Sequence, residues 1–323
     1  QIGSVSTQDS FVCKTFASGV IKTFNKTMFH VNSTCPVMLT HFSHAGVDCY
    51  ISVQRDLSGF MKKVEITVNK IATIIQDGML TVEGKSVSLP YDHTYQRLYR
   101  FGIYKKLESK VLPLSVTWYS KESKGVTSLS VDLNLPSMDV MSGMCGGLRS
   151  SDDKVKLLTN NIIRDENCHI SDETKEYSNA ICKKFQSKAM ECLEDRKDDF
   201  EKNCHLNTYS VPEEVKCSFY EEFLHDCDDS TPSRSTLLSE IPCEDPECPT
   251  GWIFHENGPA YPPTCSNPGY HSNEKTRTCL PPDGFVLNDR AEGHQSVKVE
   301  DCPCRHGRET YNPGHRLSLK CQT

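Results

Sequence analysis

The sequence predicts a mainly β protein: an antiparallel β-sandwich, then a small disulfide-rich α domain and a disulfide-knotted module. Three observations support this fold class. Apolar and polar residues alternate through the first ~150 residues, which is typical of strands. Cysteines then recur every 10 to 13 residues between Cys182 and Cys227. From Cys243 onward, proline, glycine, asparagine and cysteine interrupt the chain without a helical or strand period.

The strand signal is clearest in short segments where apolar residues occupy every second position. The segments are Val64–Val68, Leu80–Val82, Val87–Leu89, Leu114–Trp118 and Leu129–Leu133. Such alternation gives each strand one buried and one solvated face, as in an antiparallel sandwich. Because only three cysteines precede residue 140, we expect this part to be held by an apolar core.

The middle of the chain predicts short helices linked by disulfides. Ser210-Val-Pro-Glu213 has the form of a capping box with proline in the first turn. Val215, Phe219 and Phe223 follow at helical spacing.

The composition indicates an extracellular protein. Seventeen cysteines in 323 residues predict an oxidising compartment, because the cytosol keeps thiols reduced. The triplets at Asn25-Lys-Thr27 and Asn32-Ser-Thr34 are N-glycosylation sequons. We expect the chain, which opens at Gln1, to follow a cleaved signal peptide. It is therefore predicted to be secreted.

Charge and hydropathy exclude two classes of partner. A net charge of −7 and a pI near 6.0 do not favour nucleic acid, which selects basic surfaces. No apolar stretch approaches the ~20 residues that a membrane span needs. We expect neither a nucleic-acid partner nor a membrane span.

Three local motifs resemble the D assembly of von Willebrand factor and gel-forming mucins. They are the opening from Cys13 to Asn25, Gly143-Met-Cys145-Gly146, and the tail with Cys302-Pro-Cys304, Tyr311-Asn-Pro-Gly314 and Cys321. The resemblance implies four parts in a fixed order. These are a VWD-type sandwich (1–165), a C8-like helical domain (166–242), a trypsin-inhibitor-like (TIL) module (243–304) and a short E-type tail (305–323).

The family pattern also implies two disulfides. Cys13 is expected to bond Cys145, and Cys35 to bond Cys168. Each would close a loop of more than 100 residues, for which chain entropy gives roughly 4 to 5 kcal/mol.

The sequence departs from the family at the first position of the C-G-L-C motif, which is Ser142 here. Cys49 would then lack its expected mate. It is either buried or paired with a nearby cysteine, or it is a free thiol that can bridge to another chain. Cys321 competes as the unpaired cysteine of the odd total.

The calcium loop of the family is also altered. Gly147 and Arg149 occupy positions where the family has ligands, and Asp152 and Asp153 are the remaining carboxylates. Calcium takes six to eight oxygen ligands, so we interpret this loop as a solvated turn. Calcium stays possible, but no cofactor is expected.

Nothing in the sequence favours catalysis or protease inhibition. The chain lacks the common hydrolase, metalloprotease and nucleotide-binding motifs. His41 and His44 have a spacing that could bind a metal, but without a third ligand we expect a surface loop. Only six cysteines lie between Cys243 and Cys304, and the span 283–301 is unbridged, so a rigid inhibitory loop is not expected.

Two functions are therefore considered. In the first, the chain is a structural glycoprotein module that associates with itself or with other extracellular D-assembly proteins. In the second, it is a secreted binding protein that holds another macromolecule or a small ligand on the same scaffold. An enzyme is not expected.

Overall fold

The structure is a computed structural model, and it describes most of the chain. The described residues are 10–121, 123–135, 141–146, 153–163, 165–171, 180, 182–184, 196–225, 239, 241, 243–291 and 295–318.

The chain divides into two compact units. Unit 1 comprises Gln1–Tyr99 and Lys106–Cys243, and unit 2 comprises Arg100–Lys105 and Glu244–Thr323. The finer division into four parts stays a prediction.

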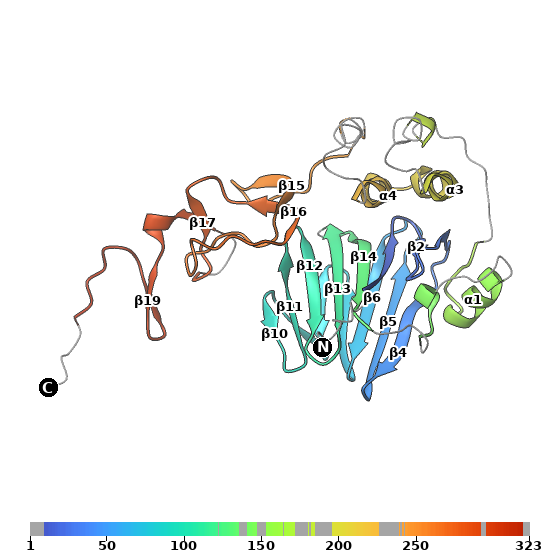
Figure 1. Ribbon diagram of the computed structural model, residues 1–323, viewed down its shortest axis with the longest axis horizontal. Helices are drawn as coiled ribbons and strands as arrows, with labels where there is room; N and C mark the ends of the chain where they lie inside the picture. Colours follow the sequence, from blue (N-terminus) through green and yellow to red (C-terminus); the bar gives the residue numbers. More distant parts are fainter. Residues whose placement is uncertain are drawn as a thin grey trace, which may run out of the picture. The chain divides into compact units, whose positions relative to one another are not determined.

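The strands of unit 1, two of which extend into residues 100–105, form one 14-stranded antiparallel sheet among the described residues (Figure 1). The strands are β1 (Phe11–Phe16), β2 (Val20–Lys22), β3 (Met28–His30), β4 (Val37–His44), β5 (Val47–Arg55), β6 (Met61–Val68), β7 (Ile71–Gln76), β8 (Met79–Val82), β9 (Lys85–Ser86), β10 (Tyr91–Asp92), β11 (Gln96–Phe101), β12 (Tyr104–Ser109), β13 (Leu114–Lys121) and β14 (Gly125–Leu133).

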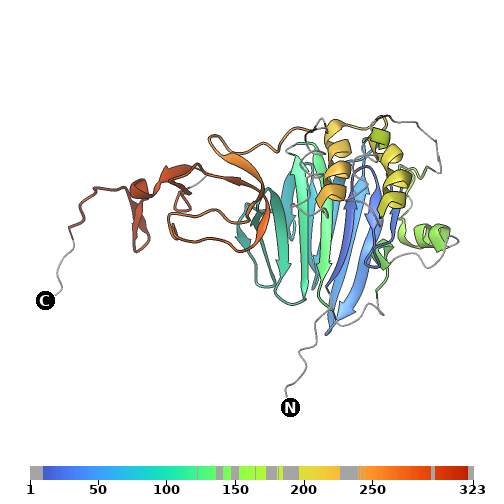
Figure 2. The same ribbon diagram turned by 45° about the horizontal axis from the view of Figure 1, so that its top comes forward.

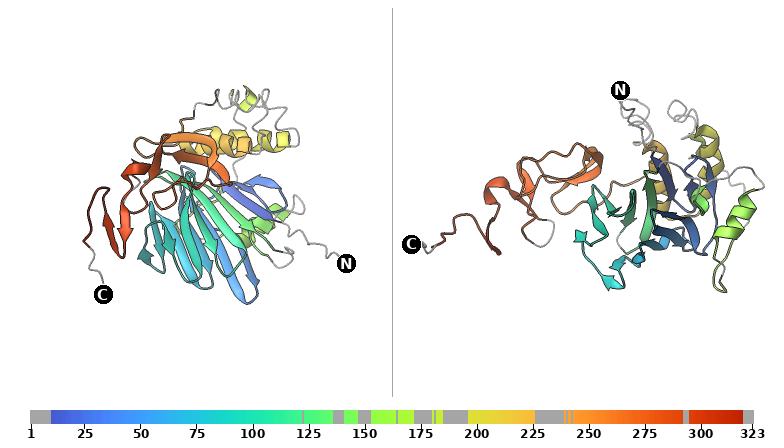
Figure 3. Two further views of the ribbon diagram at one scale, coloured as in Figure 1. Left: turned by 60° about the vertical axis from the view of Figure 1, so that its left-hand side comes forward. Right: turned by 60° about the horizontal axis from the view of Figure 1, so that its bottom comes forward.

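Strand β14 joins the two halves of this sheet. Along one edge it pairs with β13, and along the other it pairs with β1 from Leu133 to Ser128. Where β1 ends, the same edge continues to β6 through the pair Val126↔Met61. The expected two-sheet sandwich is thus a single curled sheet, whose curl Figure 3 shows from two further sides.

The mainly β antiparallel fold is confirmed, and most of the alternating segments lie in strands. They correspond to parts of β6, β8, β13 and β14. The segment Val87–Leu89 is not a strand: pairing stops at Ser86, and Pro90 has no N–H to donate. The inward side chains fill one core that includes Ile51, Val116 and Trp118.

Helices whose bounds the structure gives also accompany the sheet in the described part of unit 1. They are η1 (Met144–Gly146), α1 (Asp153–Asn161), α3 (Lys197–Thr208) and α4 (Glu213–His225). Helices α3 and α4 lie side by side over the part of the sheet that contains β1 and β14 (Figures 1 and 2). The helix expected after Ser210 is present as α4. The hydrogen bond from Lys216 N at its start is accepted by the Pro212 carbonyl, and the Ser210 backbone has a left-handed conformation.

A second apolar core joins these helices to the sheet. Phe16 of β1 and Phe60 pack against aromatic side chains of both helices, including Phe200 of α3 and Phe219 and Phe223 of α4. The Phe219 and Phe223 ring centroids are 4.9 Å apart. Burial of these rings attaches the helix pair to the sheet.

Unit 2 contains short hairpins that the sequence did not predict. They are β15 (Ile253–Pro259) with β16 (Lys275–Leu280), β17 (Phe285–Leu287) with β18 (Ser296–Lys298), and β19 (Cys304–His306) with β20 (Glu309–Tyr311); a turn η3 spans Val299–Asp301. Cys248–Cys279 joins the segment before β15 to β16, and Cys265–Cys302 joins the segment between β15 and β16 to the residue after η3. Few large side chains are buried here, so the bridges carry much of the stability.

None of the helices within the described residues combines the length and the apolar character needed to cross a membrane.

The aromatic core between helices and sheet gives the first prediction. Replacing Phe219, which is fully buried, by alanine should lower the free energy of unfolding by about 3 to 5 kcal/mol. Leu57→Ala is the matched control: this side chain is 90% exposed, so a change within about 0.5 kcal/mol is expected. Chemical denaturation measures both, and equal losses would contradict the assigned packing.

Candidate functional site

The candidate site is the pair of long-range disulfides at which the chain after β14 returns to its first strands. Cys13 of β1 bonds Cys145 of η1, with Cα atoms 5.7 Å apart. Both cysteines are buried. The N–H of Phe24 also donates to the Cys145 carbonyl at 3.0 Å. The returning chain is thus fixed against β1 and the segment after β2.

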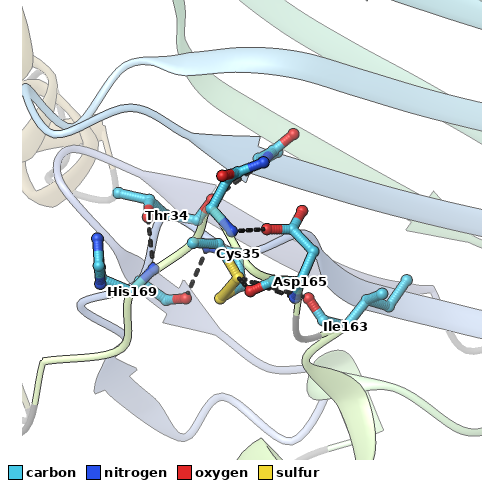
Figure 4. The surroundings of a disulfide bond; sticks show 9 residues. Thr34, Cys35, Ile163, Asp165 and His169 are labelled. Carbon is cyan, nitrogen blue, oxygen red and sulfur yellow. Dashed lines mark hydrogen bonds between the residues drawn. A yellow bond between two sulfur atoms is a disulfide. The ribbon is translucent and has the colours of Figure 1, made fainter.

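The second bridge joins Cys35 to Cys168, with Cα atoms 4.8 Å apart (Figure 4). Thr34 and His169 form a reciprocal pair beside it. The Thr34 N–H donates to the His169 carbonyl, and the His169 N–H donates to Thr34 Oγ1, both at 2.9 Å. Ser33 also forms a β-bridge with Ile170. The disulfide therefore lies within a short antiparallel ladder. These two bridges are the pairs that the family resemblance implies.

Gly143, immediately before η1, permits the close approach of the returning chain to β4. Its φ is +113°, and a Cβ there would lie 2.4 Å from the Leu39 carbonyl oxygen. Next to it, Ser142 and His41 exchange two backbone hydrogen bonds. Only glycine fits at this position without moving the backbone.

The structure places Ser142 and Cys49 on opposite faces of the sheet. Ser142 lies opposite His41, which pairs with Tyr50 on the exposed side. Cys49 belongs to the next row, opposite Phe42, and is fully buried and unpaired. Because side chains in one row share a face, a cysteine at 142 would point away from Cys49. The geometry does not support the idea that these positions are mates.

The buried thiol of Cys49 is chemically inert. Desolvation, reinforced by the neighbouring Asp48 charge, raises its pKa to about 12. Its thiolate form is therefore scarce at neutral pH, and thiolate is the reactive species. The folded unit does not present Cys49 for a bridge to another chain.

The second cysteine expected to be unpaired, Cys321, lies outside the described residues. Within them, the exposed unpaired cysteine is Cys304 of β19. The sequence patterns did not single out Cys304 as unpaired: they named Cys302-Pro-Cys304 only as part of the tail motif.

His41 and His44 lie on β4 and not on a surface loop. The segment alternates as a strand does and pairs with β5 through Tyr50 and Val47. His41 Nε2 lies 3.2 Å from an Asp48 carboxylate oxygen, and both side chains are exposed. The pair is a surface contact of small energetic weight.

The altered calcium loop is mostly outside the described residues, which exclude Gly147, Arg149 and Asp152. Asp153 begins helix α1 and is not part of a turn. One cluster elsewhere has metal-ligand types: Glu213, Cys217 and Cys243. Cys217 and Cys243 form a disulfide, so their sulfurs are not thiolate ligands.

Arg55 is a buried cation that the sequence analysis missed. It is 5% exposed, and its Nη2 donates to Thr15 Oγ1 at 3.0 Å and to the Phe16 carbonyl at 3.2 Å. Desolvation lowers its pKa to about 10. Its position was readable, because Ile51, Val53 and Arg55 share the inward face of β5.

Both sequons lie on the surface. Asn25 and Asn32 are exposed. Each lies beside the chain that follows the second cysteine of a long-range bridge: Asn25 Nδ2 donates to Gly146 O at 3.4 Å, and the Asn32 carbonyl accepts from Ser171 N at 2.9 Å.

Comparison with known proteins agrees with this architecture. Residues 13–153 match the family profile of the von Willebrand factor type D domain. The chain is 25% identical to Mucin-19 of Homo sapiens over 323 residues, covering 95% of this chain and 4% of that protein. It is 26% identical to Mucin-6 of Gallus gallus (96% of this chain, 28% of that protein) and 24% identical to Mucin-6 of Homo sapiens (98% and 14%).

These matches identify a von Willebrand factor type D domain in the first half of the chain and homology to mucins along nearly all of it. The chain spans between 4% and 28% of the length of these relatives.

The close approach at Gly143 gives the second prediction. Gly143→Ala should cost about 3 kcal/mol or more, because backbone strain adds to a collision with the Leu39 carbonyl. Gly46→Ala is the control: φ is +77°, but nothing lies within 4 Å, so about 1 kcal/mol is expected. Urea titration distinguishes them, and similar losses would show that the approach is not constraining.

Proposed function

We propose that this chain is a secreted extracellular structural module, mucin-like in type, that acts by non-covalent association with itself or with similar modules. The observation that carries the proposal is the closure of a type D domain by two buried or partly buried long-range disulfides, within a chain homologous to mucins along nearly its full length.

Secretion is supported by the state of the cysteines. Twelve of the described cysteines form six disulfides. Bonds of this kind persist outside the reducing cytosol. Glycosylation at Asn25 and Asn32 belongs to the same proposal, because their exposed side chains leave room for an attached glycan in the folded chain.

The later parts of the chain are proposed to be the C8-like, TIL-like and E-type segments. Two helices and the bridges Cys182–Cys204 and Cys217–Cys243 support the first assignment. The hairpins with Cys248–Cys279 and Cys265–Cys302 support the second.

The module is proposed to be non-catalytic. Polar groups that sequence patterns single out serve structural contacts here: His41 pairs with Asp48, and Ser142 donates to the His41 carbonyl. A rigid, disulfide-closed domain with inert buried sulfur suits a scaffold.

Association should depend on pH, which is the third prediction. Histidine as a residue type gains charge between pH 7 and pH 6, and the chain contains twelve histidines. Sedimentation should show a larger mass near pH 6 than at pH 7. Repeating the run at high salt tests whether the effect is electrostatic.

An unchanged monomer under both conditions would overturn the self-association part of the proposal. Capture of a distinct macromolecule by a monomeric chain would favour the alternative of a binding protein on the same scaffold.

We further propose that the fold needs no calcium, because the altered loop keeps only Asp152 and Asp153 as carboxylates against a need for six to eight oxygens. Calorimetry should detect no saturable binding at micromolar calcium, and chelation should leave thermal unfolding unchanged. Saturable micromolar binding would contradict this prediction.

A further inference from the structure

We propose that each N-glycosylation sequon is an acceptor only while its own long-range disulfide is open. Closure of Cys35–Cys168 locks the sequon at Asn32, and closure of Cys13–Cys145 locks the sequon at Asn25. The inference rests on the secreted location proposed above, and it adds an order of events in which glycan transfer precedes disulfide closure.

The Asn32 sequon is locked into a ladder beside its disulfide. The Asn32 carbonyl accepts from Ser171 N, and Ser33 forms a β-bridge with Ile170. The Ser33 hydroxyl also accepts from Cys35 N at 3.0 Å. The partner segment is held in place by the Cys168 bond, so opening that bond releases the ladder.

Thr34 supplies the hydroxyl that defines this sequon, and every polar atom of Thr34 is occupied. Its N–H donates to the His169 carbonyl, and its hydroxyl oxygen accepts from His169 N (Figure 4). Its carbonyl accepts from Gln54 Nε2 at 3.1 Å. In the closed form a transferase that reads this hydroxyl must first break its hydrogen bond with His169 N.

The Asn25 sequon is locked differently, in a tight turn. Thr23 N donates to the Thr27 carbonyl at 2.8 Å, and Lys26, the middle residue, is left-handed with φ 63°. The amide nitrogen that would receive the glycan, Asn25 Nδ2, donates to Gly146 O, the residue after Cys145. An extended, accessible acceptor therefore requires this turn to open.

Chain order provides the time for transfer. The closing cysteines lie 132 and 133 residues after their partners. A chain that enters the lumen from its N-terminus therefore exposes both sequons before either closing cysteine arrives. At ordinary synthesis rates the delay is roughly 7 to 27 s.

The chemical step is a group transfer. The Asn32 amide nitrogen forms a bond to the anomeric carbon of a polyprenyl-diphosphate-linked oligosaccharide. The bond from that carbon to the diphosphate oxygen breaks, the diphosphate leaves with the electron pair, and the nitrogen loses one proton. The same balance applies at Asn25.

The test uses the purified, unglycosylated full chain as acceptor for microsomal oligosaccharyltransferase with a labelled lipid-linked donor, read site by site by peptide mass spectrometry. The reduced, unfolded chain should accept at both asparagines, and the native oxidised chain at neither. Cys168→Ser should restore transfer at Asn32 alone, and Cys145→Ser at Asn25 alone.

A further variant separates the loss of the local hydrogen bond from unfolding of the whole chain. His169→Pro removes the N–H that binds Thr34 Oγ1 while both disulfides stay intact, and it should raise transfer at Asn32 without changing Asn25. Circular dichroism of each variant verifies the native sheet.

An equal rise in glycan transfer at both asparagines in either cysteine variant would overturn the proposal that each disulfide controls only its own sequon. So would efficient transfer to the native wild-type chain, or no transfer to the reduced chain. These results leave the proposed scaffold function standing, because that proposal fails on its own readout, the mass of the chain at pH 7 and pH 6.

Discussion

After β14 the chain returns to the first strands of unit 1, and the fold of this unit depends on that return. Strand β14 pairs with β13, β1 and β6, so it connects the two halves of the curled sheet. The polypeptide that follows must then travel back along β4 and the segment after β3. Cys13–Cys145 and Cys35–Cys168 fix that path at two points. Without them the returning segment would be held by isolated β-bridges, a few backbone hydrogen bonds and the burial of Met144 and Ile162.

The two units solve the stability problem in different ways. In unit 1, long strands bury one continuous apolar core, and α3 and α4 add a second through Phe16, Phe200 and Phe219. In unit 2, the hairpins are short and bury few large side chains, so two disulfides substitute for a core. Within this unit the N–H of Gly102 donates to the Ala260 carbonyl. A Cβ on Gly102 would collide with the Arg277 carbonyl, so the two backbones approach closely here. Cross-links and close backbone contacts replace apolar burial.

Sequence patterns predicted the strands that have one wet face, because alternation reports that asymmetry directly. They failed where the structure of a segment depends on residues that are distant in sequence. Val87–Leu89 alternates but is not a strand, although Val87 N still donates to the Leu80 carbonyl. His41 and His44 were expected in a loop, but both pair with β5. The inward position of Arg55 follows the period of β5, yet its role depends on Phe16 and Thr15, far away in sequence. The two long-range bridges came from a family resemblance, since spacing alone cannot choose among so many cysteines.

The case of Cys49 shows why an odd cysteine cannot be understood from a count. Its strand neighbour Asp48 is exposed and pairs with His41, whereas one step along the chain Cys49 faces the core. That single step decides reactivity, because burial both hides the sulfur and raises its pKa to about 12. Ser142 on the opposite face could not complete a bond even as cysteine. In the described part of unit 1, the cysteine sulfur atoms are bonded in disulfides except that of Cys49, which is buried. The association proposed above would therefore rest on surface contacts, whose strength depends on complementary charge and shape.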